Sequence, residues 1–240
     1  MRRRLPRWDT GVKYLRPEKI ESAALALIAG YARQFGVTIA PPIPVEEIVE
    51  SHQGLDLRFE DLQALPRHQR ALGAIRVRAQ QVAVDLTLDP TVYPEREGRC
   101  RFTVGHEAGH WELHRHLVAP ECQSSLVVDE AEPSIVCRAG RSDDPKEWQA
   151  NQFAAYLLMP KDLIYKAWQA HRGSLNPYIA KDEIADLSAR WSLGEDETPT
   201  VGVAREMAHV FKVSGQAMQI RLLGLKLVRT EVPEPTLPLS

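Results

Sequence analysis

The stretch His106-Glu107-Ala108-Gly109-His110 constrains this chain more than any other feature, because its spacing is typical of a zinc site. Two histidines four residues apart project from one face of a helix on consecutive turns, so both imidazoles can reach one ion. Glu107 lies on the flank of that face, where it can activate a water molecule without being a ligand. The alternative is a pair of core histidines with a surface glutamate between them, since HExxH also occurs by chance.

Apolar and small residues extend the histidine face along a helix that we expect at about residues 99–116. The positions at helical spacing form one inward stripe: Phe102, His106, Gly109, His110, Leu113 and Leu117. The two histidines should therefore point toward the core. Gly109 would remove side-chain bulk beside the ion, at a helix-propensity cost of about 1 kcal/mol relative to alanine.

A catalytic zinc ion needs a third protein ligand and one open position. His116 has the spacing of the last histidine in the extended HExxHxxGxxH pattern, but Leu113 stands where that pattern needs a glycine to break the helix. Glu147 is the other candidate, because it begins a second predicted helix, residues 146–159, at the edge of its core-facing stripe. In the alternative interpretation, Asp144 and Glu147 form a capping box and Glu147 bonds back to the backbone.

Neighbouring residues of the second helix support the ligand interpretation. Ala150 and Ala154 are small enough to let this helix approach the HExxH helix. Asn151 follows Glu147 by one turn, and its side chain can hold a ligand histidine in the orientation that metal binding needs. Tyr93 and His114 are both candidates for the donor that stabilises an oxyanion, and the sequence does not separate them.

Composition places the chain among ordinary globular proteins, with 44% hydrophobic residues, 26% charged residues and a net charge of −2. This balance gives no general reason to expect nucleic acid or a membrane as partner. Three cysteines at irregular spacing indicate a reducing compartment rather than a disulfide framework. The short apolar run after the basic start continues as an amphipathic helix, so we expect no signal peptide and a cytoplasmic protein.

Four regions are expected along the chain. They are a flexible basic arm (1–17), a metallopeptidase domain (18–165), a helical region (166–230) and a disordered tail (231–240). Within the second region we expect strands near 55–59, 72–77 and 82–88, where apolar residues alternate or cluster. Residues 118–146 show no sustained periodicity and are expected to form a long loop between the two site helices.

Residues 204–222 resemble a helix-turn-helix in which Ser214 caps the second helix. Residues 200–230 carry five basic side chains and one acidic one, a net charge of +4. The segment 181–198 offsets this with six acidic and two basic side chains, and Lys212 replaces the usual turn glycine. We therefore favour a helical docking or structural module over a DNA-binding one.

Two segments together resemble the ImmA/IrrE family of metallo-endopeptidases. They are Arg101-Phe102-Thr103-Val104-Gly105-His106-Glu107-Ala108-Gly109-His110-Trp111-Glu112-Leu113-His114 and Glu147-Trp148-Gln149-Ala150-Asn151-Gln152-Phe153-Ala154-Ala155-Tyr156-Leu157-Leu158-Met159-Pro160. The resemblance covers roughly residues 18–228. It implies an α+β fold: a zincin-like domain with a small mixed or antiparallel sheet and an active-site helix, followed by a helical, helix-turn-helix-like C-terminal part.

The resemblance also implies roles and partners. His106, His110 and Glu147 would bind one Zn²⁺ per chain, with Mn²⁺ as a substitute, and Glu107 would be the general base. Typical substrates of such enzymes are helix-turn-helix repressors, cut to release stress-response or mobile-element genes. The long segment 118–146 and the absence of a sensor domain depart from the family pattern.

Two other functions remain open. In one alternative, the chain is a DNA-binding transcriptional regulator that acts through residues 200–228. Its zinc site is then vestigial or structural, with Cys137 as the candidate fourth ligand. The chain could also be a non-catalytic interaction partner. Glu107 discriminates between these and the enzyme, because a structural site has no use for a water-activating carboxylate.

Overall fold

The computed structural model describes residues 13–64, 71–124, 135–138, 144–192 and 198–231. The chain divides into two compact units, Met1–Pro160 and Lys161–Ser240. The division falls five residues before the boundary that we expected after residue 165. Most of the expected basic arm (1–12) and nearly all of the expected tail (232–240) lie outside the described residues.

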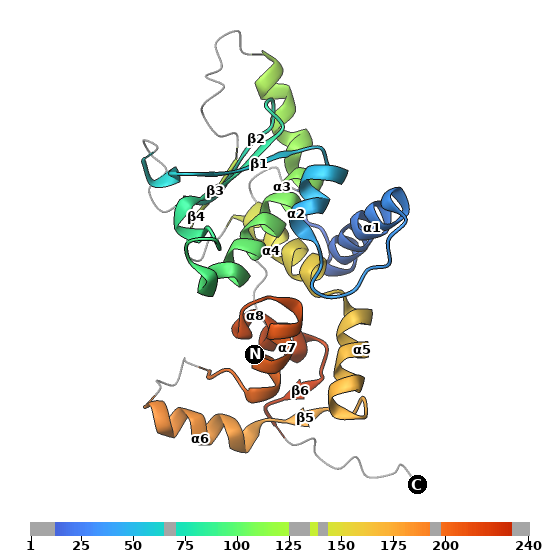
Figure 1. Cartoon of the computed structure of the whole chain (residues 1–240), viewed down its shortest axis with the longest axis vertical. Helices are drawn as coiled ribbons and strands as arrows, with labels where there is room; N and C mark the ends of the chain where they lie inside the picture. Colours follow the sequence, from blue (N-terminus) through green and yellow to red (C-terminus); the bar gives the residue numbers. More distant parts are fainter. Residues whose placement is uncertain (1–12, 65–70, 125–134, 139–143, 193–197, 232–240) are drawn as a thin grey trace. The chain divides into compact units, whose positions relative to one another are not determined.

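The first unit combines helices with a four-stranded sheet (Figure 1). In chain order its main elements are α1 (Pro17–Phe35), α2 (Val45–Glu47), a π-helical turn (Ile48–His52), β1 (Asp56–Glu60), β2 (Ala71–Arg76), β3 (Gln81–Asp85), α3 (Glu97–Ser124), β4 (Ile135–Arg138) and α4 (Pro145–Leu158). Gly36 ends α1 in the left-handed conformation (φ +65°), which glycine adopts without steric cost. The amphipathic helix expected after the basic start and the α+β class are confirmed.

The sheet has the order β1-β3-β2-β4 and is mixed. β1 runs parallel to β3, whereas β2 pairs antiparallel with both β3 and β4. The three expected strands are present, although the third ends at Asp85 and continues as a 3-10 turn, Leu86–Leu88. Asp85 causes this change, because its carboxylate accepts hydrogen bonds from the Thr87 and Leu62 amides, both at 3.0 Å.

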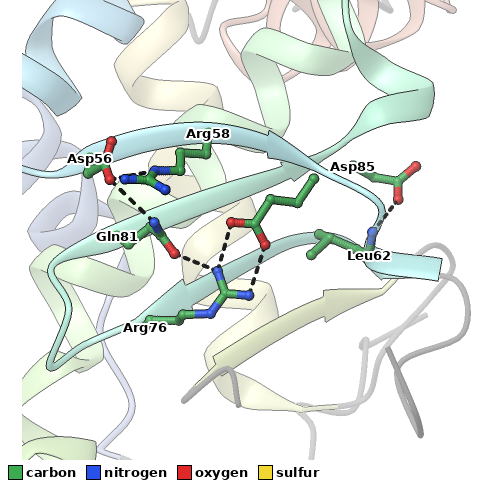
Figure 2. A network of polar contacts seen from close by, with 7 residues as sticks. Asp56, Arg58, Leu62, Arg76, Gln81 and Asp85 are labelled. Carbon is green, nitrogen blue, oxygen red and sulfur yellow. Dashed lines mark hydrogen bonds and ion pairs between the residues drawn. The ribbon is translucent and has the colours of Figure 1, made fainter. Parts of the chain in front are cut away.

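Polar side chains from three strands form a connected network (Figure 2). Arg76 donates to both carboxylate oxygens of Glu60, at 3.1 and 2.9 Å, and to Gln81 Oε1 at 2.6 Å. Gln81 in turn donates to Asp56, which also pairs with Arg58 at 2.6 Å. The buried Arg76 guanidinium is therefore neutralised and ties β2 to β1 and β3.

α3 contacts β2 and β3 on one side and α4 on another, and α1 packs on α4 (Figure 1). Because α3 is covered on several sides, its central turns are buried all round. The expected inward stripe is therefore wrong at its far end, where Leu113 is only half-buried and Leu117 is exposed.

The expectation of a long loop over residues 118–146 is corrected at both ends. α3 continues past His116 to Ser124, and residues 135–138 form the edge strand β4. A helix can pass through Pro120 because the φ angle of proline is helical, at the cost of one hydrogen bond. Residues 125–134 and 139–143 of the expected loop lie outside the described part of the chain.

The second unit contains α5 (Lys161–Arg172), α6 (Lys181–Trp191), α7 (Gly202–Phe211) and α8 (Gly215–Gly224). Its two short strands, β5 (Tyr178–Ile179) and β6 (Val228–Arg229), pair in parallel. The expected helical region thus contains four described helices, and Gly173 follows α5 with a positive φ. No described helix has both the length and the apolar character required to cross a membrane.

α7 and α8 are joined by a short turn and contact each other, as in the helix-turn-helix that this segment resembles. Lys212 ends α7 in the left-handed conformation, the role that glycine usually has in such a turn. Ser214 caps α8 by accepting from the Ala217 amide at 3.1 Å, as the sequence predicted. Gln219 is buried and bonds to the backbone at Val201 and Pro199, so this polar side chain of α8 faces inward.

Candidate metal centre

Two adjacent helices bring three expected ligands together. His106 and His110 lie on consecutive turns of α3, and Glu147 lies in the first turn of α4. One ligand atom from each of these side chains lies within 4.8 Å of the others. Both histidines are at most 1% exposed. The sequence prediction of these three residues as one cluster thus agrees with their placement.

Gly109 permits the close approach of the two helices. A Cβ at this position would lie 3.0 Å from Phe153 Cβ and 3.2 Å from Ala150 Cα, both on α4. The glycine therefore makes room for α4 rather than for an ion, which corrects the reason that we gave for it. Ala150 and Ala154 are fully buried on the facing side of α4, as expected from their size.

Glu147 combines two features that the sequence left as alternatives. Asp144 is the N-cap of α4 and accepts a hydrogen bond from the Lys146 amide at 2.8 Å, with Pro145 following the cap. The Glu147 carboxylate, however, is directed to the histidines, with Oε2 3.3 Å from His106 Nε2 and Oε1 3.0 Å from His110 Nε2. Burial would raise the pKa of Glu147, but contacts with both histidines outweigh it and hold the pKa well below its usual value.

The outer nitrogen of each histidine has its own partner. His106 Nδ1 lies 2.9 Å from Asn151 Oδ1, so Asn151 orients the ring as the sequence suggested. His110 Nδ1 lies 3.0 Å from His114 Nδ1, and His114 Nε2 lies 3.1 Å from Gln149 Oε1. Sequence reasoning missed Gln149, and the only signal for it is an amide side chain on the core-facing side of a helix.

The donor set fits a cation. An Nδ1–H donating to the Asn151 oxygen leaves a lone pair on His106 Nε2, which lies 2.9 Å from His110 Nε2. Two imidazole nitrogens and a carboxylate then face one point, an arrangement that needs positive charge at its centre. Burial lowers the pKa of His110, so a proton is a poor cation there at neutral pH. Two nitrogens and one carboxylate are ligands that zinc prefers.

Glu107 is 0% exposed, and neither of its carboxylate oxygens has a hydrogen-bond partner among the described residues. It lies against β2, where a Cβ on Gly73 would stand only 2.3 Å from Glu107 Oε1. Burial raises the pKa of Glu107 to about 8, with a smaller lowering effect of His106. A bound cation nearby would lower this pKa and favour the carboxylate. A surface glutamate, as in the core-histidine alternative, is excluded.

Other candidates do not join this cluster. His116 is exposed on α3, so the extended three-histidine pattern is absent from the described site. His114 bonds to the outer side of His110, which does not suit the oxyanion role that we considered. Tyr93 is 37% exposed and stacks under the Arg96 guanidinium at 4.6 Å. The side chain of Cys137 lies outside what the structure describes.

An HExxH helix, a carboxylate from the next helix and a buried unpaired glutamate define a metallopeptidase-like domain. Residues 93–223 match the family described as the IrrE N-terminal-like domain, and the chain belongs to this peptidase family. The family relation predicted from the two helical segments is thereby confirmed.

Comparisons with individual proteins add little to this relation. No curated protein sequence matches the chain. Among solved structures, a Mycobacterium tuberculosis transcriptional regulator is similar at 14% identity and a TM-score of 0.43, over 87% of this chain and 52% of that one. The chain therefore spans about half the length of that structure, and a likeness of this size does not bear on activity.

Proposed function

We propose that the protein is a zinc-dependent endopeptidase with His106, His110 and Glu147 as ligands and Glu107 as general base. The observation that carries this proposal is the Glu107 carboxylate, which is fully buried and unpaired among the described residues beside the ligand cluster. An unpaired buried carboxylate costs free energy, so a purely structural metal site would gain nothing from it. Mn²⁺ is a candidate substitute for zinc.

The chemistry divides between the ion and the chain. Bound zinc would supply Lewis-acid chemistry, which makes water a stronger nucleophile near neutral pH and polarises the scissile carbonyl. Glu107 would take the proton from the attacking water and deliver it to the nitrogen of the leaving peptide. Asn151 holds the His106 ring through its Nδ1 atom during this sequence.

We further propose that the substrate is one specific protein, a helix-turn-helix repressor of stress-response or mobile-element genes. Burial supports selectivity, because His106, Glu107 and His110 are each at most 1% exposed and do not offer a wide open cleft. The family supports the substrate class, but no described contact identifies the repressor. Selection would then depend on docking surfaces of the chain.

The rival proposal is a DNA-binding regulator that uses α7 and α8. Its support is the pair of helices α7 and α8 joined by a short turn, together with the net charge of +4 over residues 200–230. Against it, Ile220 on α8 is 64% exposed and Val210 on α7 is 49% exposed, apolar surface more suited to a protein than to phosphates. Salt-dependent binding of duplex DNA that is lost in Arg221→Ala would favour the rival.

Metal analysis and one substitution test the enzyme proposal. The purified protein should contain about one zinc ion per chain, the number expected of a mononuclear catalytic site. Glu107→Gln should keep the metal, because Glu107 is not a ligand, and should lose cleavage. A Glu107→Gln protein that cuts at the wild-type rate would remove Glu107 from the base role. His116→Ala is the matched control, since His116 is exposed outside the cluster.

A further inference from the structure

A buried chain of hydrogen bonds leads away from the metal centre toward the N-terminal segment. It runs from His110 Nδ1 to His114 Nδ1 (3.0 Å), and from His114 Nε2 to Gln149 Oε1 (3.1 Å). Gln149 Nε2 then donates to the Lys13 carbonyl at 3.0 Å. His110 is 0% exposed and both His114 and Gln149 are 1% exposed, so water does not compete for these bonds.

The Lys13 carbonyl fixes the direction of the chain, because a carbonyl oxygen can only accept. The Gln149 amide must therefore present its NH₂ group to Lys13 and its oxygen to His114. That oxygen also only accepts, so His114 must carry a proton on Nε2. The Tyr14 ring stacks on Trp148 of α4 with centroids 6.1 Å apart, which holds this part of the N-terminal segment in place.

The proton position on His114 also fixes the proton position on His110, one of the proposed metal ligands. With its proton on Nε2, a neutral His114 has a lone pair on Nδ1, and His110 Nδ1–H can donate to it. His110 Nε2 is then free of a proton and faces His106 Nε2 and Glu147. The reverse order, with His114 Nδ1–H donating, would place the proton of a neutral His110 on Nε2 and block metal binding.

We propose that His114 and Gln149 are positioning residues that set the tautomer and orientation of His110, with the Lys13 carbonyl as the fixed end of the chain. This inference rests on the proposed metal site. The arrangement at His106 is simpler, because a single amide, Asn151, contacts the outer nitrogen of that ring directly. It also gives residues 13 and 14 a part in the metal centre that their position in the sequence does not suggest.

Histidine ¹⁵N NMR tests the position of each proton directly, because it is read on the wild-type protein itself. In the wild-type protein, with and without zinc, we expect His114 to be neutral with its proton on Nε2. We expect His110 to carry a proton on Nδ1 in both states. Resonances are assigned by comparison with single histidine variants. A proton on His114 Nδ1 in the zinc-loaded protein would overturn the proposal.

If His114 and Gln149 position His110 for the metal, their loss should weaken zinc binding. The zinc affinity is measured by competition with a chromophoric chelator. His114→Leu and Gln149→Leu should each weaken zinc binding by about 10- to 100-fold, the usual effect of removing an outer hydrogen-bond partner of a ligand. His114→Gln should recover most of that loss, because its amide again offers an acceptor to His110 and a donor to Gln149. Gln152→Leu, on the same helix and half-buried, is the matched control and should bind zinc as the wild type does.

The outcomes separate the two proposals. If the wild type binds zinc tightly and His114→Leu binds it equally well, the positioning role fails while the metal site stands. If the wild type binds no zinc, the metal site fails, and the tautomer measurement still decides the direction of the chain. A loss in His114→Leu that His114→Gln does not recover would indicate a packing role and contradict the proposal.

Discussion

Glu107 occupies a space that a glycine on β2 leaves open. Because a Cβ on Gly73 would lie 2.3 Å from Glu107 Oε1 and 2.8 Å from Thr103 Cγ2, any larger residue there must displace one of them. The HExxH spacing predicts the glutamate and its role. It cannot predict Gly73, which is far away in the sequence and meets Glu107 only because α3 packs on the sheet.

Gly73→Ala should therefore damage catalysis without removing the metal. Displacing the Glu107 carboxylate by about 1 Å can cost on the order of 100-fold in rate, whereas the three ligands are not touched. The measurement is the cleavage rate together with the zinc content. Gly105→Ala is the control, because its Cβ would meet Ala154 Cβ at an ordinary 3.5 Å. Wild-type cleavage by Gly73→Ala would show that Glu107 is not held by this contact.

Cys100 on α3 should be an unreactive thiol. Burial, with the nearby Glu46 and Asp89 carboxylates, raises its pKa to about 12, compared with about 8.5 in an unfolded chain. The folded state thus favours the protonated thiol, and its contribution to stability falls as pH rises from about 9 toward 12. At pH 8.5, iodoacetamide should label Cys100 only after unfolding, as measured by peptide mass spectrometry. Rapid labelling of Cys100 in the native protein would contradict this burial.

At the scale of elements, the sequence predicted those helices and caps that depend on local periodicity and residue spacing. The helices that carry the ligands and the Ser214 cap follow from local rules, and all are present. The end of α3 and the strand β4 were missed, because a strand of four residues at a sheet edge is defined by its pairing with β2. Such pairing is not visible in the sequence of residues 118–146 alone.

The sheet should depend on the pairing of Arg76 with Glu60. The Arg76 side chain is 10% exposed, so Glu60→Ala would leave a largely buried guanidinium with one partner fewer. We expect a loss of about 1–3 kcal/mol in the free energy of unfolding, measured by urea denaturation. Glu95→Ala removes a surface pair with Arg96 at 3.7 Å and 69% exposure of the glutamate, and should change stability by less than about 0.5 kcal/mol. Equal effects of the two substitutions would contradict a structural role for the network.

At the scale of the whole molecule, the segment that matches the family and the two compact units have different boundaries. Residues 93–223 match the family, whereas the compact units divide after Pro160. The matched segment therefore includes α7 and most of α8, as well as the two helices of the metal centre. The sequence predicted a boundary after residue 165, which lies within α5, whereas the compact units divide at Pro160, between two helices with almost no linker.

The most direct test of the account compares protein N-termini in a lysate treated with zinc-loaded wild type or with Glu107→Gln. The account predicts one new N-terminus with the wild type, within a helix-turn-helix repressor, and none with the variant. Many unrelated cuts would contradict the single-substrate proposal. The same cut at the same rate with Glu107→Gln would contradict the catalytic role of Glu107, on which the proposed function depends.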